Sequence, residues 1–230
     1  MQNDMPQIKD NLLRVLERIE KAAKRVGRDS KEIKLVAVSK TVDLARIREA
    51  IDAGVSILGE NYIQEAQKKI EALGRPVAWH FIGHLQSNKA KSAVHLFDMI
   101  HSLDSPHLAV ELNRRAAQAE RVLKVLIEVK LSEEVTKFGA EVEGVLALAG
   151  RVLQLDHLFL EGLMTMPPYF EVPEMSRPYF VRLRGLKERM AKEGMPVKEL
   201  SMGMSNDFEI AIEEGATSIR VGTAIFGARR

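Results

Sequence analysis

Short apolar segments alternate with amphipathic ones along most of the chain, and this alternation constrains the fold more than any other feature. Eight segments have the length and composition of buried strands; they are residues 35–38, 55–59, 77–82, 98–103, 122–129, 157–166, 199–204 and 218–221. The residues between them repeat their apolar positions with helical spacing. Crossovers of this kind join parallel strands in a right-handed sense. The pattern predicts an α/β protein folded as a closed (β/α)8 barrel.

The punctuation of the helices adds detail to this prediction. Residues 7–26 form an amphipathic pattern that ends at Gly27 and precedes the first strand, which predicts an extra N-terminal helix. Ser105 is expected to cap the helix that Pro106 begins. Asn61, with Gln64 three residues on, has the spacing of a reciprocal helix cap. Ser205 is expected to cap the last long helix.

An open doubly wound sheet is the alternative to a barrel. Such sheets usually have five or six strands and a glycine-rich first turn. Here the first strand leads into Val38-Ser39-Lys40-Thr41, which contains no glycine. Residues 1–230 show no linker, repeat or low-complexity tract, so we expect one domain. Residues 164–175 contain three prolines and are expected to form a long loop at the barrel mouth.

Composition excludes several classes of function. The 230 residues include no cysteine, which rules out disulfides and thiolate chemistry. A net charge of +2 gives no argument for a nucleic-acid partner. No apolar run approaches the roughly 20 residues that span a bilayer, and residues 1–6 lack the features of a secretory signal. We expect a cytoplasmic protein with no membrane or nucleic-acid partner, whose function depends on a site.

Lys40 stands at the end of the first strand, where a barrel of this type places its reactive groups. A surface lysine is the simpler interpretation. Barrels also commonly bind phosphate with the loops after strands seven and eight. Ser205 follows the seventh strand, and Gly222 and Thr223 follow the eighth. Ordinary caps and turns would explain each segment alone, but both lie where a phosphate site is expected.

Taken together, these residues describe a binding site for pyridoxal 5′-phosphate (PLP). In an apolar barrel mouth, burial would favour the neutral amine of Lys40, which can form a Schiff base with an aldehyde. A phosphate on that aldehyde would anchor it. Arg220 lies on the same strand face as Gly222 and would point at the ligand, where a guanidinium keeps a pyridine nitrogen unprotonated. A Schiff-base aldolase acting on a phosphosugar is an alternative.

His80 and His84 are the only pair of residues that suggests a metal. Their spacing of four would bring two ligands together on a helix. His80, however, falls in a predicted strand and His84 in the loop after it. We therefore predict no metal site, and expect residues 84–89 to form a polar wall of the cavity mouth.

Several segments resemble the pyridoxal-phosphate homeostasis proteins, small relatives of the alanine racemase N-terminal barrel with PLP fold type III. The resemblance spans nearly the whole chain and is carried by residues 36–41, 59–65, 79–89, 161–164, 200–207 and 219–228. Family members often have a basic residue and proline after the Lys-Thr pair, where this chain has Val42 and Asp43.

The resemblance implies specific roles. Lys40 would carry PLP as a Schiff base, Ser205, Gly222 and Thr223 would hold its phosphate, Arg220 would face the pyridine nitrogen, and Asn61 would lie close to the ring. PLP-dependent apoenzymes are the recipients that a homeostasis role implies, and we expect a monomer.

Racemases of this barrel type use two bases, one of them a tyrosine from an additional C-terminal domain. The tyrosines of this chain are Tyr62, Tyr169 and Tyr179, and none lies in a recognisable second domain. We therefore expect a PLP carrier in vitamin B6 and amino-acid homeostasis, without catalytic turnover. A minimal one-domain racemase is the enzymatic alternative.

Overall fold

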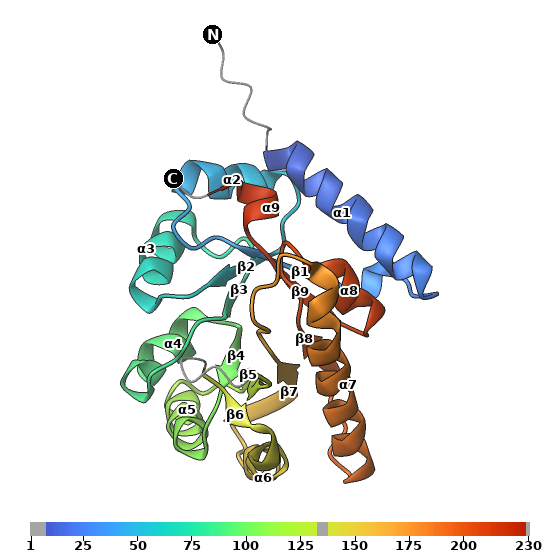
Figure 1. Ribbon diagram of the computed structural model, residues 1–230. Helices are drawn as coiled ribbons and strands as arrows, with labels where there is room; N and C mark the ends of the chain where they lie inside the picture. The colour runs from blue at the N-terminus through green and yellow to red at the C-terminus, as the bar shows by residue number, and fades with distance from the viewer. Residues whose placement is uncertain (1–7, 133–137, 229–230) are drawn as a thin grey trace.

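The computed structural model describes residues 8–132 and 138–228 and shows a closed barrel of parallel strands (Figure 1). The barrel strands are β1 (Lys34–Val38), β2 (Ile57–Glu60), β3 (Ala78–Phe81), β4 (Met99–Leu103), β5 (Leu123–Lys130), β7 (Leu158–Met164), β8 (Glu199–Ser201) and β9 (Ser218–Val221). Each pairs with its neighbours in chain order, and β9 pairs with β1 to close the ring. The predicted (β/α)8 barrel is confirmed. The export prediction concerned residues 1–6, which lie outside the described part.

One short strand was not expected. β6 (Ala140–Glu141) pairs with the end of β5 rather than joining the ring. Gly139 directs the chain back against β5, since its φ of +123° is disfavoured for other residues and a Cβ there would lie 2.8 Å from the Lys130 nitrogen.

The helices surround the barrel (Figure 1). They are α1 (Ile8–Arg25), α2 (Leu44–Asp52), α3 (Ile63–Leu73), α4 (Ala90–Leu96), α5 (Pro106–Gln118), α6 (Val145–Val152), α7 (Arg177–Lys192), α8 (Phe208–Glu213) and α9 (Thr223–Phe226). α1 is the predicted extra helix, and its apolar stripe is buried against α8, α9 and α2. Within the described ranges, no helix combines the length and apolar composition needed to cross a bilayer.

The helix caps only partly follow the sequence. Ser105 accepts a hydrogen bond from the Leu108 nitrogen, as predicted. The predicted Asn61 cap is wrong, because α3 begins one residue later, after Tyr62, without a side-chain cap. The Ser205 cap is also wrong: α8 begins after Asp207, and the Ser205 hydroxyl contacts a different helix.

The apolar core has two parts of unequal size. Most of it fills the space between strands and helices, with Trp79, Phe81 and Phe97 among its largest buried side chains. A second cluster of Met99, Leu126 and Met164 is separate from the first and comes from the barrel strands alone. Bulky aliphatic side chains usually fill barrel interiors. Here buried polar side chains occupy much of that space; they are His80, His101, Glu128, Ser201 and Arg220.

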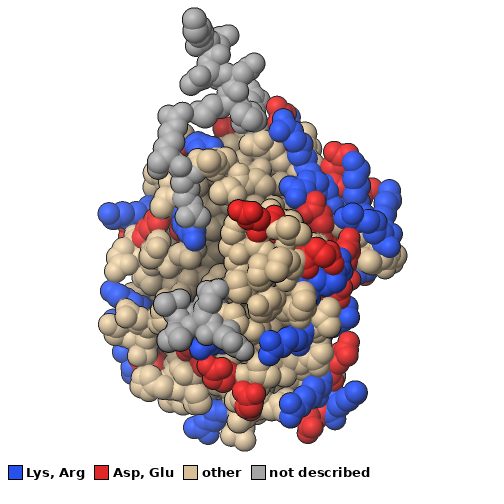
Figure 2. Space-filling model, in the orientation of Figure 1, with Lys and Arg blue, Asp and Glu red and all other residues tan. Residues whose placement is uncertain are grey.

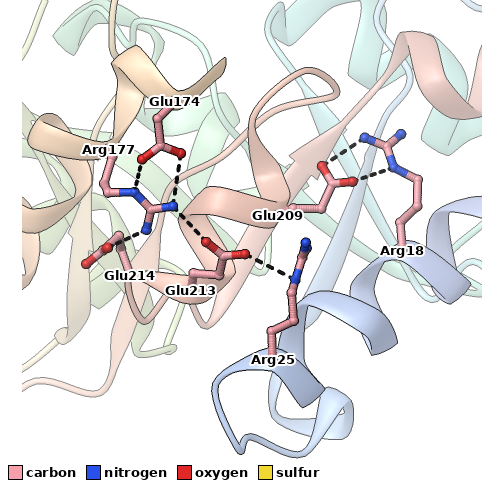
Figure 3. A network of polar contacts seen from close by, with 7 residues as sticks. All are labelled: Arg18, Arg25, Glu174, Arg177, Glu209, Glu213 and Glu214. Carbon is pink, nitrogen blue, oxygen red and sulfur yellow. Dashed lines mark hydrogen bonds and ion pairs between the residues drawn. The ribbon is translucent and has the colours of Figure 1, made fainter. Parts of the chain in front are cut away.

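A network of ion pairs joins α1, α7 and α8 on the outside of the barrel (Figure 3). Arg177 contacts Glu174, Glu213 at 2.7 Å and Glu214 at 2.6 Å. Two arginines of α1 extend the network: Arg25 contacts Glu213, and Arg18 pairs with Glu209. This surface network ties α7, the helix after β7, to the N-terminal helix α1 and to α8, the helix after β8.

Candidate functional site

A cavity of about 310 Å³ opens at the C-terminal ends of the strands. Its lining comes from the ends of β1, β2, β3 and β9 and from the loops after β7 and β8; the lining residues are Val38, Lys40, Asn61, Ile82, Met166, Pro168, Tyr169, Phe170, Met204, Ser205, Asn206, Asp207, Arg220, Gly222 and Thr223. Figure 2 shows a face of the molecule that is hollowed near its middle between mostly uncharged side chains. Charged side chains of both signs gather instead over α1. A volume of this size lies in the range of small-molecule sites.

All six residues that the sequence singled out line this one cavity: Lys40, Asn61, Ser205, Arg220, Gly222 and Thr223. They come from four different strand ends, so only the closed barrel brings them together. Their roles toward a ligand remain predictions.

Lys40 sits in a tight turn between β1 and α2. The turn is closed by the Val42 nitrogen, which donates to the Ser39 oxygen. Thr41 adopts a φ of +62°, which is uncommon for a β-branched residue. Asp43 then caps α2 by accepting from the Arg46 nitrogen. Asp43, one of the two positions at which this chain departs from the resembled pattern, therefore caps the helix that follows Lys40.

Arg220 is fully enclosed on one side of the cavity. Its guanidinium donates to the Ser201 hydroxyl at 2.6 Å and to the Thr165 carbonyl at 2.8 Å. Burial lowers the pKa of Arg220 to about 10, opposed by the negative charges of Glu128 and Asp207. Arg220 is therefore still a cation at neutral pH, held in one orientation.

A chain of hydrogen bonds continues from Arg220 across the barrel interior. His101 Nδ1 lies 3.0 Å from the Ser201 hydroxyl, and His101 Nε2 lies 3.0 Å from His80 Nδ1. Burial lowers the pKa of His101 well below its ordinary value and that of His80 to about 4, so both rings are neutral at pH 7. Since Ser201 accepts from Arg220, its hydrogen can go to His101 Nδ1, and His101 Nε2 then donates to His80. This places His80 in the barrel interior, bonded to His101.

The predicted phosphate segments contact each other directly. The Ser205 hydroxyl accepts from the Gly222 and Ala224 nitrogens, each at 3.3 Å. It therefore caps the short helix α9 after β9 instead of α8. Gly222 lies against Val38 at the end of β1, since a Cβ on Gly222 would be at ordinary contact distance, 3.4 Å, from it. The loops after β8 and β9 thus form one wall of the cavity.

Asn61 contributes an unpaired polar atom to the opposite wall. Its side-chain oxygen is buried and has no hydrogen-bond partner among the described residues. Gly83 packs against the Asn61 backbone so closely that a Cβ there would lie 2.4 Å from the Asn61 carbonyl oxygen. A buried acceptor without a partner is uncommon and costs stability, so the Asn61 oxygen is a candidate contact for a ligand in the cavity.

Sequence reasoning placed the loop after β7 at the mouth but did not name its contacts. Met166, Pro168, Tyr169 and Phe170 all line the cavity, and Asn206 Nδ2 donates to the Phe170 carbonyl at 2.9 Å. The prolines of this segment were the signal that located the loop. The choice of residues facing the cavity depends on its irregular backbone path, which no periodicity reveals.

Residues 84–89 do not form the expected polar wall. Of residues 82–89, only Ile82 is among the described residues that line the cavity. The His84 ring instead stacks on Phe138 at 3.6 Å between centroids, and its Nδ1 lies 3.6 Å from an Asp104 oxygen. The chain after Gly83 runs away from the cavity before the helix begins.

Comparison with known proteins identifies relatives over nearly the whole chain. The family model described as alanine racemase, N-terminal domain, matches residues 11–230. The pyridoxal phosphate homeostasis protein of Aquifex aeolicus is 48% identical over 223 residues, covering 96% of this chain and 98% of that one. Its counterpart in Escherichia coli K12 is 42% identical and covers 98% of both chains.

A solved structure is also close. PipY of Synechococcus elongatus PCC7942, solved with PLP bound, is 38% identical, with a TM-score of 0.81 over 91% of this chain and 100% of that one. On the strength of this match, of the family model and of the full-length relatives, the chain belongs to the family of pyridoxal phosphate homeostasis proteins, built on the alanine racemase N-terminal barrel.

Proposed function

We propose that this protein binds PLP in the cavity and holds it reversibly on Lys40, as a carrier in vitamin B6 and amino-acid homeostasis. The observation that carries the proposal is the convergence of Lys40, Arg220 and the Ser205 wall on one cavity. PipY, solved with PLP bound, supports the choice of ligand.

The residues present fit the chemical groups of PLP. A phosphate needs hydrogen-bond donors, and the Ser205 and Thr223 hydroxyls supply them. The aldehyde needs an amine, which Lys40 supplies. The buried, unpaired oxygen of Asn61 would gain a polar neighbour from the ligand.

The surroundings of Arg220 favour holding over turnover. PLP supplies an aldehyde that bonds to amines and a ring that withdraws electrons from them. With a pKa of about 10, Arg220 remains charged and donates hydrogen bonds without giving up a proton. A ring nitrogen facing it would stay unprotonated, which weakens electron withdrawal.

A second candidate function, racemisation, rests on Tyr169. This tyrosine lines the cavity from the loop after β7. It is 77% exposed and so is not fixed by packing. Washout of deuterium from the α-carbon of labelled alanine, at a rate well above that with free PLP and lost in Tyr169→Phe, would establish it.

Titration with PLP tests the main proposal. We expect the wild-type protein to give a yellow adduct that borohydride reduces, and Lys40→Ala to give none. Lys91→Ala is the matched control, because Lys91 is an exposed lysine distant from the cavity lining. A wild-type protein without a chromophore, or an unchanged adduct in Lys40→Ala, would contradict the proposal.

The proposed carrier acts as a one-domain monomer in the cytoplasm and supplies PLP to apoenzymes. Light scattering of the purified protein should give the mass of one chain. Reactivation of a PLP-dependent apoenzyme by the loaded carrier, compared with the two proteins separated by a dialysis membrane, distinguishes transfer by contact from transfer by release.

A further inference from the structure

A buried polar cluster lies directly behind the turn that carries Lys40. Its centre is Lys69 on α3, which is only 5% exposed. The Lys69 ammonium donates to the Ser39 carbonyl at 2.6 Å, to Glu60 at 2.7 Å and to Glu65 at 2.7 Å. An ammonium has three hydrogens, so each has an acceptor.

The cluster holds both residues next to Lys40. On one side, Ser39 is held twice, because its hydroxyl donates to Glu60 at 2.6 Å while its carbonyl accepts from Lys69. On the other side, the Thr41 nitrogen donates to Glu65 at 2.6 Å. Thr41 is the residue with the φ of +62°. An unfavourable backbone conformation persists only where its surroundings enforce it.

The cluster is separate from the cavity itself. Lys69, Glu60 and Glu65 do not appear among the described residues that line it. These three side chains come from β2 and α3, whereas Lys40 follows β1. The cluster contacts the Lys40 turn at Ser39 and at Thr41.

From this geometry we propose that Lys69 is a positioning residue, which with Glu60 and Glu65 fixes the turn of residues 39–41 so that the Lys40 amine meets an aldehyde in the cavity. The inference rests on the proposed function. The reaction that it serves is a condensation: the Lys40 nitrogen forms a C=N bond with the aldehyde carbon. The aldehyde oxygen leaves as water with two protons from the nitrogen. Such a step is sensitive to the placement of the nitrogen.

Comparing the binding of two ligands distinguishes a misplaced Lys40 amine from a general loss of the cavity's structure. PLP can bond to Lys40, whereas pyridoxine 5′-phosphate has the same ring and phosphate but an alcohol in place of the aldehyde. In Lys69→Met we expect the affinity for PLP to fall by about tenfold or more, because part of the binding free energy comes from a bond that needs the Lys40 nitrogen in place. Pyridoxine 5′-phosphate should bind within about twofold of wild type, since binding without the covalent bond does not use the Lys40 nitrogen in this way.

The neighbouring Lys68→Met is the matched control, because Lys68 is exposed on the same helix, and it should bind both ligands as wild type does. Should Lys69→Met fail to fold, Glu65→Ala decides instead, with the exposed Glu71→Ala as its control. Glu65→Ala removes the acceptor of the Thr41 nitrogen and should weaken PLP binding selectively.

Equal PLP binding in the variant and wild type would overturn the inference. So would an equal loss of both ligands, because that shows a structural role only. If the wild type itself forms no Schiff base with PLP, the proposed function fails, and this inference fails with it.

Discussion

Two clusters in this protein place a single cation among carboxylates at similar distances, one on the surface and one in the interior. Arg177 contacts three glutamates outside the barrel (Figure 3), and its side chain is 31% exposed. Lys69 contacts two glutamates and a carbonyl behind the cavity, and its side chain is 6% exposed. Judged by their nitrogen–oxygen distances alone, the two clusters would contribute equally to stability.

Their surroundings separate them. On the surface the carboxylates have other partners, because Glu213 also contacts Arg25 and Glu214 also contacts Arg184. In the interior, Lys69 is the cation that Glu60 contacts, and the second Glu60 oxygen is buried without a hydrogen-bond partner among the described residues. Burial raises the pKa of Glu60, with Lys69 and Ser39 opposing it. Loss of the cation should therefore be costly only in the interior.

Lys69→Met should have the largest effect on stability. Removing one partner of a buried ion pair leaves an uncompensated charge, which typically costs about 3–5 kcal/mol in the free energy of unfolding. Urea denaturation at pH 7 measures the loss, with Lys68→Met as control. A loss below about 1 kcal/mol would mean that water reaches the cluster and that the comparison is wrong.

Replacing both Glu60 and Lys69 tests whether charge or hydrogen bonding dominates the buried cluster. The double variant Glu60→Leu with Lys69→Met also removes the buried charge of Glu60 and leaves only that of Glu65, whose side chain is 25% exposed, so we expect it to be more stable than Lys69→Met alone. A double variant less stable than the single one would show that hydrogen bonds to Ser39, not charge, dominate the cluster.

Glu128 offers a buried carboxylate that has no lysine partner among the described residues. Burial raises its pKa from 4.5 to about 7, which Arg220 opposes. Because the pKa of the folded state is the higher one, the stability that Glu128 contributes is present below pH 4.5 and is lost as the pH rises to about 7. The free energy of unfolding of Glu128→Gln should thus exceed that of wild type by on the order of 2–3 kcal/mol at pH 8 and by almost nothing at pH 4.5.

Urea denaturation of ligand-free wild type and Glu128→Gln at both pH values measures this difference. Effects of pH that the two proteins share cancel in the comparison. A variant that is less stable at pH 8 would instead show that the pKa of Glu128 is lowered, not raised, and that its carboxylate contributes stability as the counterion of Arg220.

Arg177→Met should have the smallest effect. We expect a loss of about 1 kcal/mol or less, because exposed ion pairs are weak and its glutamates keep other partners or solvent. The loss should shrink further in about 1 M salt, whereas that of Lys69→Met should not. An Arg177→Met loss as large as that of Lys69→Met would remove the distinction between the two clusters.

The same distinction explains what the sequence could predict. The eight strands and the N-terminal helix follow from local periodicity, and Lys40, Ser205 and Gly222 could be assigned to strand ends. Once the barrel closes, residues at adjoining strand ends must meet. The long loop at residues 164–175 could be located from its prolines, although not its contacts.

The buried polar contacts could not be predicted, since they depend on the register of several strands at once. Lys69 belongs to a lysine pair that looks like an exposed helix face, and only its spacing of four from Glu65 gives a signal. His80 and His101 meet because β3 and β4 are neighbours with their interior faces aligned. Ser205 was assigned to the wrong helix, because capping side chains are chosen by geometry across loops as well as along the chain.

The most direct test of the account is to find the site of covalent attachment. The protein is incubated with PLP, reduced with borohydride, digested and analysed by mass spectrometry. We predict one pyridoxyl group per chain, on the peptide that contains Lys40. Modification of another lysine, or of none, would contradict the central claim that Lys40 holds the cofactor.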